Sequence, residues 1–386
     1  MTFKISARAN LIAAASMFLA AGCTTGEDTG SKPDPGMNSN GSADQGSDVG
    51  PSVNSAVSVT FLASDQPGLT TNLAPSMINA WGITQFDGMF WIADNGTGKV
   101  SIVDGKGVPA TGKVASGAID LGVGITGVVA TDVAADDASS FSIHTSDACA
   151  PARLIFASET GQLLGVNPEL STTGGFVVVD RSNCDAIYKG VAIVQGASGP
   201  LILAADFHNT RIDVFNANFE LVTDISFGGA QFLPEGFAPF NVMTFDNTVY
   251  VTYAKQDADM EDDVPGPGLG FVVAFNASGE PLGVAKGPLL NAPWGMELAR
   301  GFGPFPDALL VGNFGDGHVT AIDRSTMMVL GQLTDDSGAP IAIDGLWGLS
   351  FGAAVTKALP DGLYFAAGPQ DETHGLFGVI TSVSSP

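Results

Sequence analysis

Two short stretches of this 386-residue chain carry residue types that could move a proton or hold a cation. Residues 206–209 read Asp-Phe-His-Asn, and residues 371–374 read Asp-Glu-Thr-His. Histidine is the side chain that most often serves as a general acid or base, because its pKa lies near neutral pH. His208 and His374 are therefore the candidate catalytic residues.

Similar polar residues follow most of the apolar runs along the chain. If the fold gathers these turns on one concave face, their side chains would form a ligand site. The candidate ligand-binding residues are Asp94, Asn95, Glu159, Asp206, His208, Asn209, Lys255, Asp257, Asn313, Asp316, Asp371 and His374. The alternative is ordinary turn chemistry, since Asn, Asp and Gly tolerate left-handed backbone. That alternative applies above all to residues 94–96 and 313–317.

Asn and Asp oxygens also suit a hard cation. The candidate metal ligands are Asn79, Asn241, Asn291 and Asp206, and calcium is the candidate cofactor. A second hypothesis is zinc held by His208, His318 and His374, although these lie in repeats that are not all adjacent. The segment 257–263, DADMEDD, is spaced like a calcium loop, but Asp262 stands where such a loop needs Gly. We interpret it as a solvated acidic loop, with a secondary cation site as the alternative.

Nucleophile motifs are missing from the sequence. It has no G-x-S-x-G, and no Cys with a base nearby. Beyond Cys23, the thiols are Cys149 and Cys184. Export would favour a disulfide between them, whereas their predicted places on opposite faces of the fold argue against it, so both alternatives stay open.

A repeat of about fifty residues positions these groups. Six units begin at Trp81-Gly82, Thr126-Gly127, Lys189-Gly190, Phe240-Asn241, Trp294-Gly295 and Trp347-Gly348. Each continues with short strands, which is typical of a β-propeller. We predict an all-β, six-bladed β-propeller in which residues 57–64, VSVTFLAS, close the last blade and leave no open sheet edge. The Trp and Phe residues are predicted to pack between blades.

Long motifs add a resemblance to a known group of proteins. They include NAPWG, ADFHN, VTYAKQD and GPQDETHGLFG, within a match that covers about residues 57–382. The chain resembles an uncharacterised family of exported bacterial proteins whose blades are similar to NHL repeats. This resemblance implies the propeller and export, but no reaction. Some members end in a sorting tail, which this chain lacks.

The first 56 residues indicate the cellular location of the protein. Residues 1–22 have a basic start and a short apolar run, as in a signal peptide. The run ends in Leu-Ala-Ala-Gly before Cys23, which resembles a bacterial lipobox and implies lipidation of Cys23. Residues 23–56 are then a lipidated Cys and a disordered tether with a reach of about 30 Å. We expect a lipid-anchored protein of the bacterial cell envelope, at the outer membrane or cell surface.

Charge excludes one class of partner. The chain carries 40 acidic and 15 basic residues, a net charge of −25, whereas nucleic-acid binding needs clustered Lys and Arg. Two functions of different class remain. The first is a surface-tethered module that binds a small molecule, glycan or protein at the mouth of the propeller channel. The alternative is a metal-assisted hydrolase or lyase of the lactonase-like type, which needs Asn and Asp from three or more blades to converge near a His.

Overall fold

The structure is a computed structural model that describes residues 56–111, 114, 119–122, 124–132, 139–228 and 233–383. The chain forms two units, Met1–Val49 and Gly50–Pro386. The predicted signal peptide, Cys23 and nearly all of the predicted tether lie outside the described residues. Within the described ranges, no helix is both long and apolar enough to span a bilayer.

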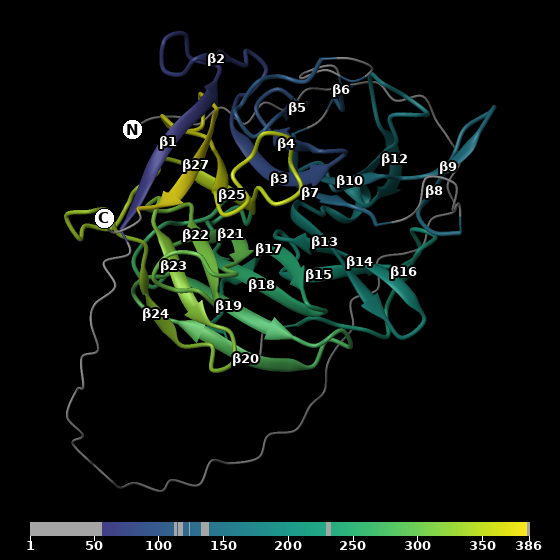
Figure 1. The fold of residues 1–386 in the computed structure, drawn as a ribbon. Helices are drawn as coiled ribbons and strands as arrows, with labels where there is room; N and C mark the ends of the chain where they lie inside the picture. Colours follow the sequence, from purple (N-terminus) through teal and green to yellow (C-terminus); the bar gives the residue numbers. More distant parts are fainter. Residues whose placement is uncertain are drawn as a thin grey trace, which may run out of the picture. The chain divides into compact units, whose positions relative to one another are not determined.

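The second unit is a six-bladed β-propeller, as predicted (Figure 1). The first blade contains β3 (Ala80–Phe86), β4 (Met89–Asp94), β5 (Lys99–Val103) and β6 (Ile119–Asp120). The second contains β7 (Ile125–Ala130), β10 (Leu154–Ser158), β11 (Gln162–Val166) and β12 (Phe176–Asp180). The third contains β13 (Tyr188–Gly196), β14 (Gly199–Asp206), β15 (Arg211–Phe215) and β16 (Leu221–Val222).

The remaining blades follow in chain order around the ring. The fourth contains β17 (Phe237–Phe245), β18 (Thr248–Lys255), β19 (Gly270–Phe275) and β20 (Pro281–Lys286). The fifth contains β21 (Pro293–Leu298), β22 (Ala308–Asn313), β23 (Val319–Asp323) and β24 (Val329–Gln332). The sixth begins with β25 (Leu346–Phe351), β26 (Leu363–Ala367) and β27 (Leu376–Ser382). Within each blade, neighbouring strands are antiparallel.

The N-terminal strand closes the ring, which confirms the predicted closure. Strand β1 (Val57–Ser64) pairs antiparallel with β27, in a register that runs from Val57↔Ser382 to Ser64↔Leu376. The short β2 (Asn72–Leu73) then pairs parallel with the end of β1. Both described ends of the chain therefore lie in the sixth blade, as Figure 1 shows for β1 and β27.

The strand sequences follow from their place in a blade. The second strands are apolar on both sides, as in β10, LIFAS, because a neighbouring blade covers each face. The outer strands carry exposed residues, as in β20, because no further strand covers them. The inner strands carry Gly where they approach one another: a Cβ on Gly82 would lie 2.6 Å from the carbonyl oxygen of Thr126. The repeated Gly is thus a packing requirement of the ring.

A hairpin that the repeat did not predict lies between β7 and β10. It consists of β8 (Ser142–His144) and β9 (Cys149–Pro151). Phe141 anchors it, because that buried ring packs 5.9 Å from Phe219 of the third blade. Cys149 is a free, exposed thiol at the hairpin. Cys149 and Cys184 are therefore not bridged in this structure.

Candidate functional site

The residues before the repeated Gly or Asn lie around the propeller axis, at the end of the inner strands where the chain enters them. Four of them, Trp81, Phe240, Trp294 and Trp347, form one buried cluster together with Phe207. Trp347 stacks on Trp81 at 3.7 Å between ring centroids. Trp294 meets both indoles edge-on, at 5.9 and 5.6 Å. The predicted packing role of these aromatic residues thus extends across the axis, where they form a floor beneath the channel mouth.

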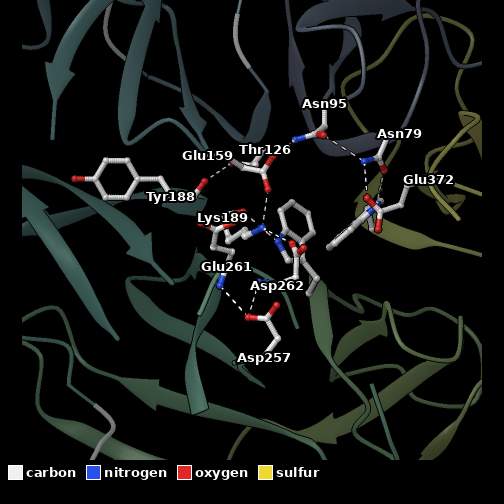
Figure 2. Close-up of polar contacts among 12 residues, drawn as sticks. Asn79, Asn95, Thr126, Glu159, Tyr188, Lys189, Asp257, Glu261, Asp262 and Glu372 are labelled. Atoms are coloured by element: carbon white, nitrogen blue, oxygen red, sulfur yellow. Dashed lines mark hydrogen bonds and ion pairs between the residues drawn. The ribbon is translucent and has the colours of Figure 1, made fainter. Parts of the chain in front are cut away.

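Lys189 stands above this floor, at the corresponding position of the third blade. Its side chain is 2% exposed, and its ammonium lies 5.3 Å from the Trp81 ring centroid and 5.9 Å from that of Phe207. The ammonium contacts Glu159 Oε1 at 2.6 Å and Asp262 Oδ1 at 3.4 Å. Burial lowers the pKa of Lys189, but Glu159 and Asp262 outweigh burial and hold the pKa above its ordinary value. The ammonium is therefore a fixed positive charge (Figure 2).

Amide groups extend this network toward the first and sixth blades. Asn95 Nδ2 donates to Glu159 Oε2 at 2.9 Å, and Asn79 Nδ2 donates to Glu372 Oε2 at 2.8 Å. The Trp347 indole nitrogen donates to Asn79 Oδ1 at 3.1 Å, which ties the network to the aromatic floor. We call Asn79, Asn95, Glu159, Lys189, Asp262, Asp263 and Glu372 the mouth face. Figure 2 shows most of them converging, and apart from Lys189 in β13 they lie in links, turns and loops outside the strands.

An unusual turn delivers Glu372 to the mouth face. Gln370, Asp371 and Glu372 have φ angles of 58°, 54° and 65°, a run of three non-glycine residues in the left-handed region. Each such residue costs on the order of 1 kcal/mol. Strained backbone of this kind tends to occur at functional sites, and here it places a carboxylate beside Asn79. Asp371 itself is exposed.

The acidic loop 257–263 also belongs to the mouth. Asp257 Oδ1 accepts hydrogen bonds from the backbone N–H groups of Glu261 and Asp262, so Asp257 caps its own loop. Asp262 reaches Lys189, and Asp263 lies next to it. Burial is the main cause that raises the pKa of Asp263; Asp262 and Glu372 also raise it, Lys189 lowers it, and the net pKa is about 7. Our interpretation of a fully solvated loop was therefore incomplete.

Several predicted site residues lie inside blades rather than at the mouth. Asp94 is fully buried and accepts a hydrogen bond from Ser101 at 2.6 Å, and burial raises its pKa well above the ordinary value. Asp206 is also buried, between Asn209 at 2.9 Å and Arg211 at 3.4 Å. Burial raises the pKa of Asp206 to about 6, while the hydrogen bond from Asn209 lowers it. These side chains bind their own blades together.

The fourth and fifth blades place these predicted residues at strand ends and in a turn, since Lys255 ends β18, Asn313 ends β22 and Asp316 follows it. Lys255 lies over the Phe237 ring, 5.5 Å from its centroid. Asn313 donates to the carbonyl oxygen of Leu289 at 2.9 Å, and Asp316 accepts from Asn291 at 3.1 Å. For Asn313 and Asp316, the turn chemistry considered as the alternative describes the observed contacts.

The histidines do not gather at one point. His374 Nδ1 lies 2.7 Å from Asp65 Oδ2, and His318 Nδ1 lies 2.7 Å from the carbonyl oxygen of Ile341. His208 has a buried Nδ1 without a hydrogen-bond partner. In the part of the chain that the structure describes, no group of three or more His, Cys, Asp or Glu is placed to hold a metal. The zinc hypothesis on His208, His318 and His374 was therefore wrong in its geometry.

The amide groups proposed for calcium make hydrogen bonds within the protein. Asn241 donates to the carbonyl oxygen of Trp294 at 2.9 Å and accepts from the Val242 N–H at 2.8 Å. Asn291 Oδ1 accepts from the Gly266 N–H at 2.6 Å. Asn79 is engaged by Trp347 and Glu372. These contacts give each amide a structural role in holding blades and links together.

Sequence reasoning missed Lys189, Asp262, Asp263 and Glu372 as parts of one site. A signal for Lys189 was present, because a lysine occupies a position at which four other repeats have an aromatic residue. The position of Asp262 and Asp263 depends on how the loop folds back over the axis, and that is not encoded in the repeat.

Comparisons with known proteins agree with the fold and leave the activity open. No protein-family model matches the chain. It is 28% identical over 331 residues to the uncharacterized protein L690 of Acanthamoeba polyphaga mimivirus, a match that covers 83% of this chain and 85% of that protein. Among solved structures, it is similar to a protein of unknown function from Bacteroides thetaiotaomicron, with a TM-score of 0.51 and 11% identity over 84% of this chain and 76% of the other.

A further structural likeness is to virginiamycin B lyase from Staphylococcus aureus, with a TM-score of 0.47 and 12% identity over 85% of this chain and all of that one. The predicted membership of an exported bacterial family stays a prediction, since the relative named above is a viral protein. The chain is an all-β protein with a six-bladed β-propeller.

Proposed function

We propose that this propeller is a binding module that takes its ligand at the mouth face. The observation that supports this proposal is the Lys189 network. It sets fixed charges and amide groups from several blades around an aromatic floor, at the mouth of a closed ring. Convergent polar groups over aromatic rings are the usual composition of ligand sites.

The alternative, a metal-assisted hydrolase or lyase, has less support. It required Asn and Asp side chains from three or more blades to converge near a histidine. Asn241 and Asn291 instead bond to neighbouring backbone, and His374 pairs with Asp65 on the outer side of the sixth blade. These contacts favour binding over catalysis.

A ligand screen with matched variants tests the binding proposal. The full chain is screened by thermal shift against glycans, peptides and small polar molecules, and hits are titrated against two variants. Glu159→Gln removes a mouth carboxylate, while Glu280→Gln removes an exposed carboxylate from the β19–β20 turn, at the opposite end of the blades. We expect the first variant to weaken binding at least about tenfold, the equivalent of 1.4 kcal/mol, and the second by less than about twofold.

Two outcomes would count against this proposal. Ligands that bind both variants equally would show that binding occurs elsewhere. Metal-dependent turnover of a lactone or ester that Glu159→Gln abolishes would establish the enzymatic alternative.

We further propose that the propeller is held at a bacterial cell envelope by a lipid on Cys23, without a nucleic-acid partner. The support is the sequence of residues 1–23 and the net charge of −25. In a bacterial host, radiolabelled palmitate should label the full chain and not the Cys23→Ala variant, which should leave the membrane fraction. Equal labelling of both forms, or none, would refute lipidation at this residue.

A further inference from the structure

The mouth face carries more negative than positive charge. The carboxyl groups of Glu159 and Asp262 contact the Lys189 ammonium directly, at 2.6 and 3.4 Å. The Asp263 carboxyl also interacts electrostatically with Lys189, and it is repelled by Asp262 and Glu372. Three carboxyl groups therefore act on one ammonium, and Glu372 adds a fourth carboxyl group that acts on Asp263. A second positive charge would stabilise this arrangement.

Two buried atoms, each on a residue that interacts with Lys189, have no hydrogen-bond partner. They are the acceptor Asp263 Oδ2 and the donor Trp81 Nε1. Trp81 is only 3% exposed, and its ring centroid lies 5.3 Å from the Lys189 ammonium. Buried polar atoms in folded proteins nearly always have a partner. This unpaired donor and acceptor indicate a ligand that supplies both an N–H group and an acceptor oxygen.

The surroundings favour an organic cation over a metal ion. The described residues contain no cluster of three His, Cys, Asp or Glu side chains arranged around a metal position. By contrast, Lys189 shows that the mouth suits an ammonium group, since the rings of Trp81 and Phe207 and the carboxylate of Glu159 already hold one. Aromatic faces attract ammonium groups by cation–π interaction.

We propose that the mouth face binds a protonated amine whose molecule also carries a peptide carbonyl, as a lysine residue in a peptide does. The amine pairs with Asp263 and Glu372, and a carbonyl oxygen accepts from the Trp81 indole. Asp262, which is 59% exposed, lies at the solvent side of the site. This inference rests on the proposed binding function and names its ligand class.

The proposal predicts a pH dependence. The groups that act on the Asp263 carboxyl are Lys189, Asp262 and Glu372, and burial with these neighbours raises its pKa to about 7. A protonated carboxyl does not attract an ammonium. Amine affinity should therefore rise between pH 5.5 and pH 8, over the range in which Asp263 loses its proton.

Calorimetric titration of the full chain with Nα-acetyl-lysine methylamide tests the proposal. The Nε-acetylated form of this probe, which has no charge, is the ligand control, and butylamine, which has no carbonyl, tests the role of the indole. Asp263→Asn is the test variant, and Glu280→Gln is the matched control. Asp263→Asn should fold, because burial already disfavours the charged form of Asp263 and its Oδ2 has no hydrogen-bond partner to lose.

We expect the charged probe to bind, the acetylated form not to bind, and butylamine to bind more weakly than the charged probe. Asp263→Asn should lower the affinity at least about tenfold and remove its rise with pH, and Glu280→Gln should leave it within about twofold. If the charged probe binds Asp263→Asn and Glu280→Gln with equal affinity, its binding reflects general attraction to an acidic protein, and the proposal is wrong. If the probe does not bind while another ligand binds in a Glu159-dependent manner, the amine proposal fails and the binding function stands.

Discussion

Replacing Lys189 with Met should destabilise the propeller by about 3 kcal/mol at pH 8, because it leaves the mouth carboxylates without their cation. Removing one partner of a buried ion pair typically costs 3–5 kcal/mol. We expect the lower end, since Glu159 and Asp262 are 33% and 59% exposed and can turn toward water. Met keeps the length and the apolar stem of Lys189, so packing on Trp81 and Phe207 is retained.

The size of this loss should depend on pH. Burial already raises the pKa of Asp263 from 3.8 to about 7, so its ionised form is disfavoured in the folded state. Folded protein thus binds more protons than unfolded protein between these values, and stability falls as pH rises through this range. Without Lys189, the pKa of Asp263 rises further and the fall continues to higher pH. The loss caused by Lys189→Met should consequently be smaller at pH 5 than at pH 8.

Urea unfolding at both pH values measures this effect. Lys357→Met is the matched control, because Lys357 is 55% exposed in its pair with Asp104. Asp104 is only 6% exposed, but its carboxylate also accepts hydrogen bonds from the backbone N–H groups of Lys106 and Val108, so the loss should be less than about 1 kcal/mol. If the Lys189→Met protein is as stable as the wild type at pH 8, the ion pairs of Lys189 do not contribute to the free energy of unfolding, and the prediction is wrong.

Removing the closing strand should have the largest effect on the fold. A chain that begins after Ser64 leaves the β27 edge open and uncovers the buried contacts of Val57 and Ala63. Lost backbone hydrogen bonds at about 1 kcal/mol each, together with apolar burial, give a loss of at least about 5 kcal/mol. This is comparable with the whole stability of many domains. The open edge should also promote association between molecules.

The control for this truncation is a chain that begins at Gly50 and so keeps the whole second unit. Circular dichroism melting and analytical ultracentrifugation compare the two proteins. We expect the longer protein to melt like the full chain as a monomer, and the shorter one to melt much earlier or associate. Equal melting temperatures would mean that the ring does not depend on β1 for closure.

The ring itself could be predicted from the sequence, whereas most of the mouth could not. Strand order, blade number and the closure by residues 57–64 follow from repeated local patterns, because each blade is one supersecondary unit. The mouth depends instead on contacts between distant residues. Glu372 reaches Asn79 across 293 positions in the sequence, and Lys189 reaches Asp262 across 73. Asp94 also shows that residue type alone does not identify a site residue. An aspartate suits a ligand site, but its position at the end of β4 buries this side chain within the blade.

The closing strand also has a consequence for synthesis. Val57 pairs with Ser382, so β1, the first strand of the propeller to be synthesised, cannot pair until β27, the last one, has been synthesised. At translation rates of about 5–20 residues per second, that wait lasts from about 15 s to about a minute. The five complete blades can form in turn during this time, but the ring cannot close.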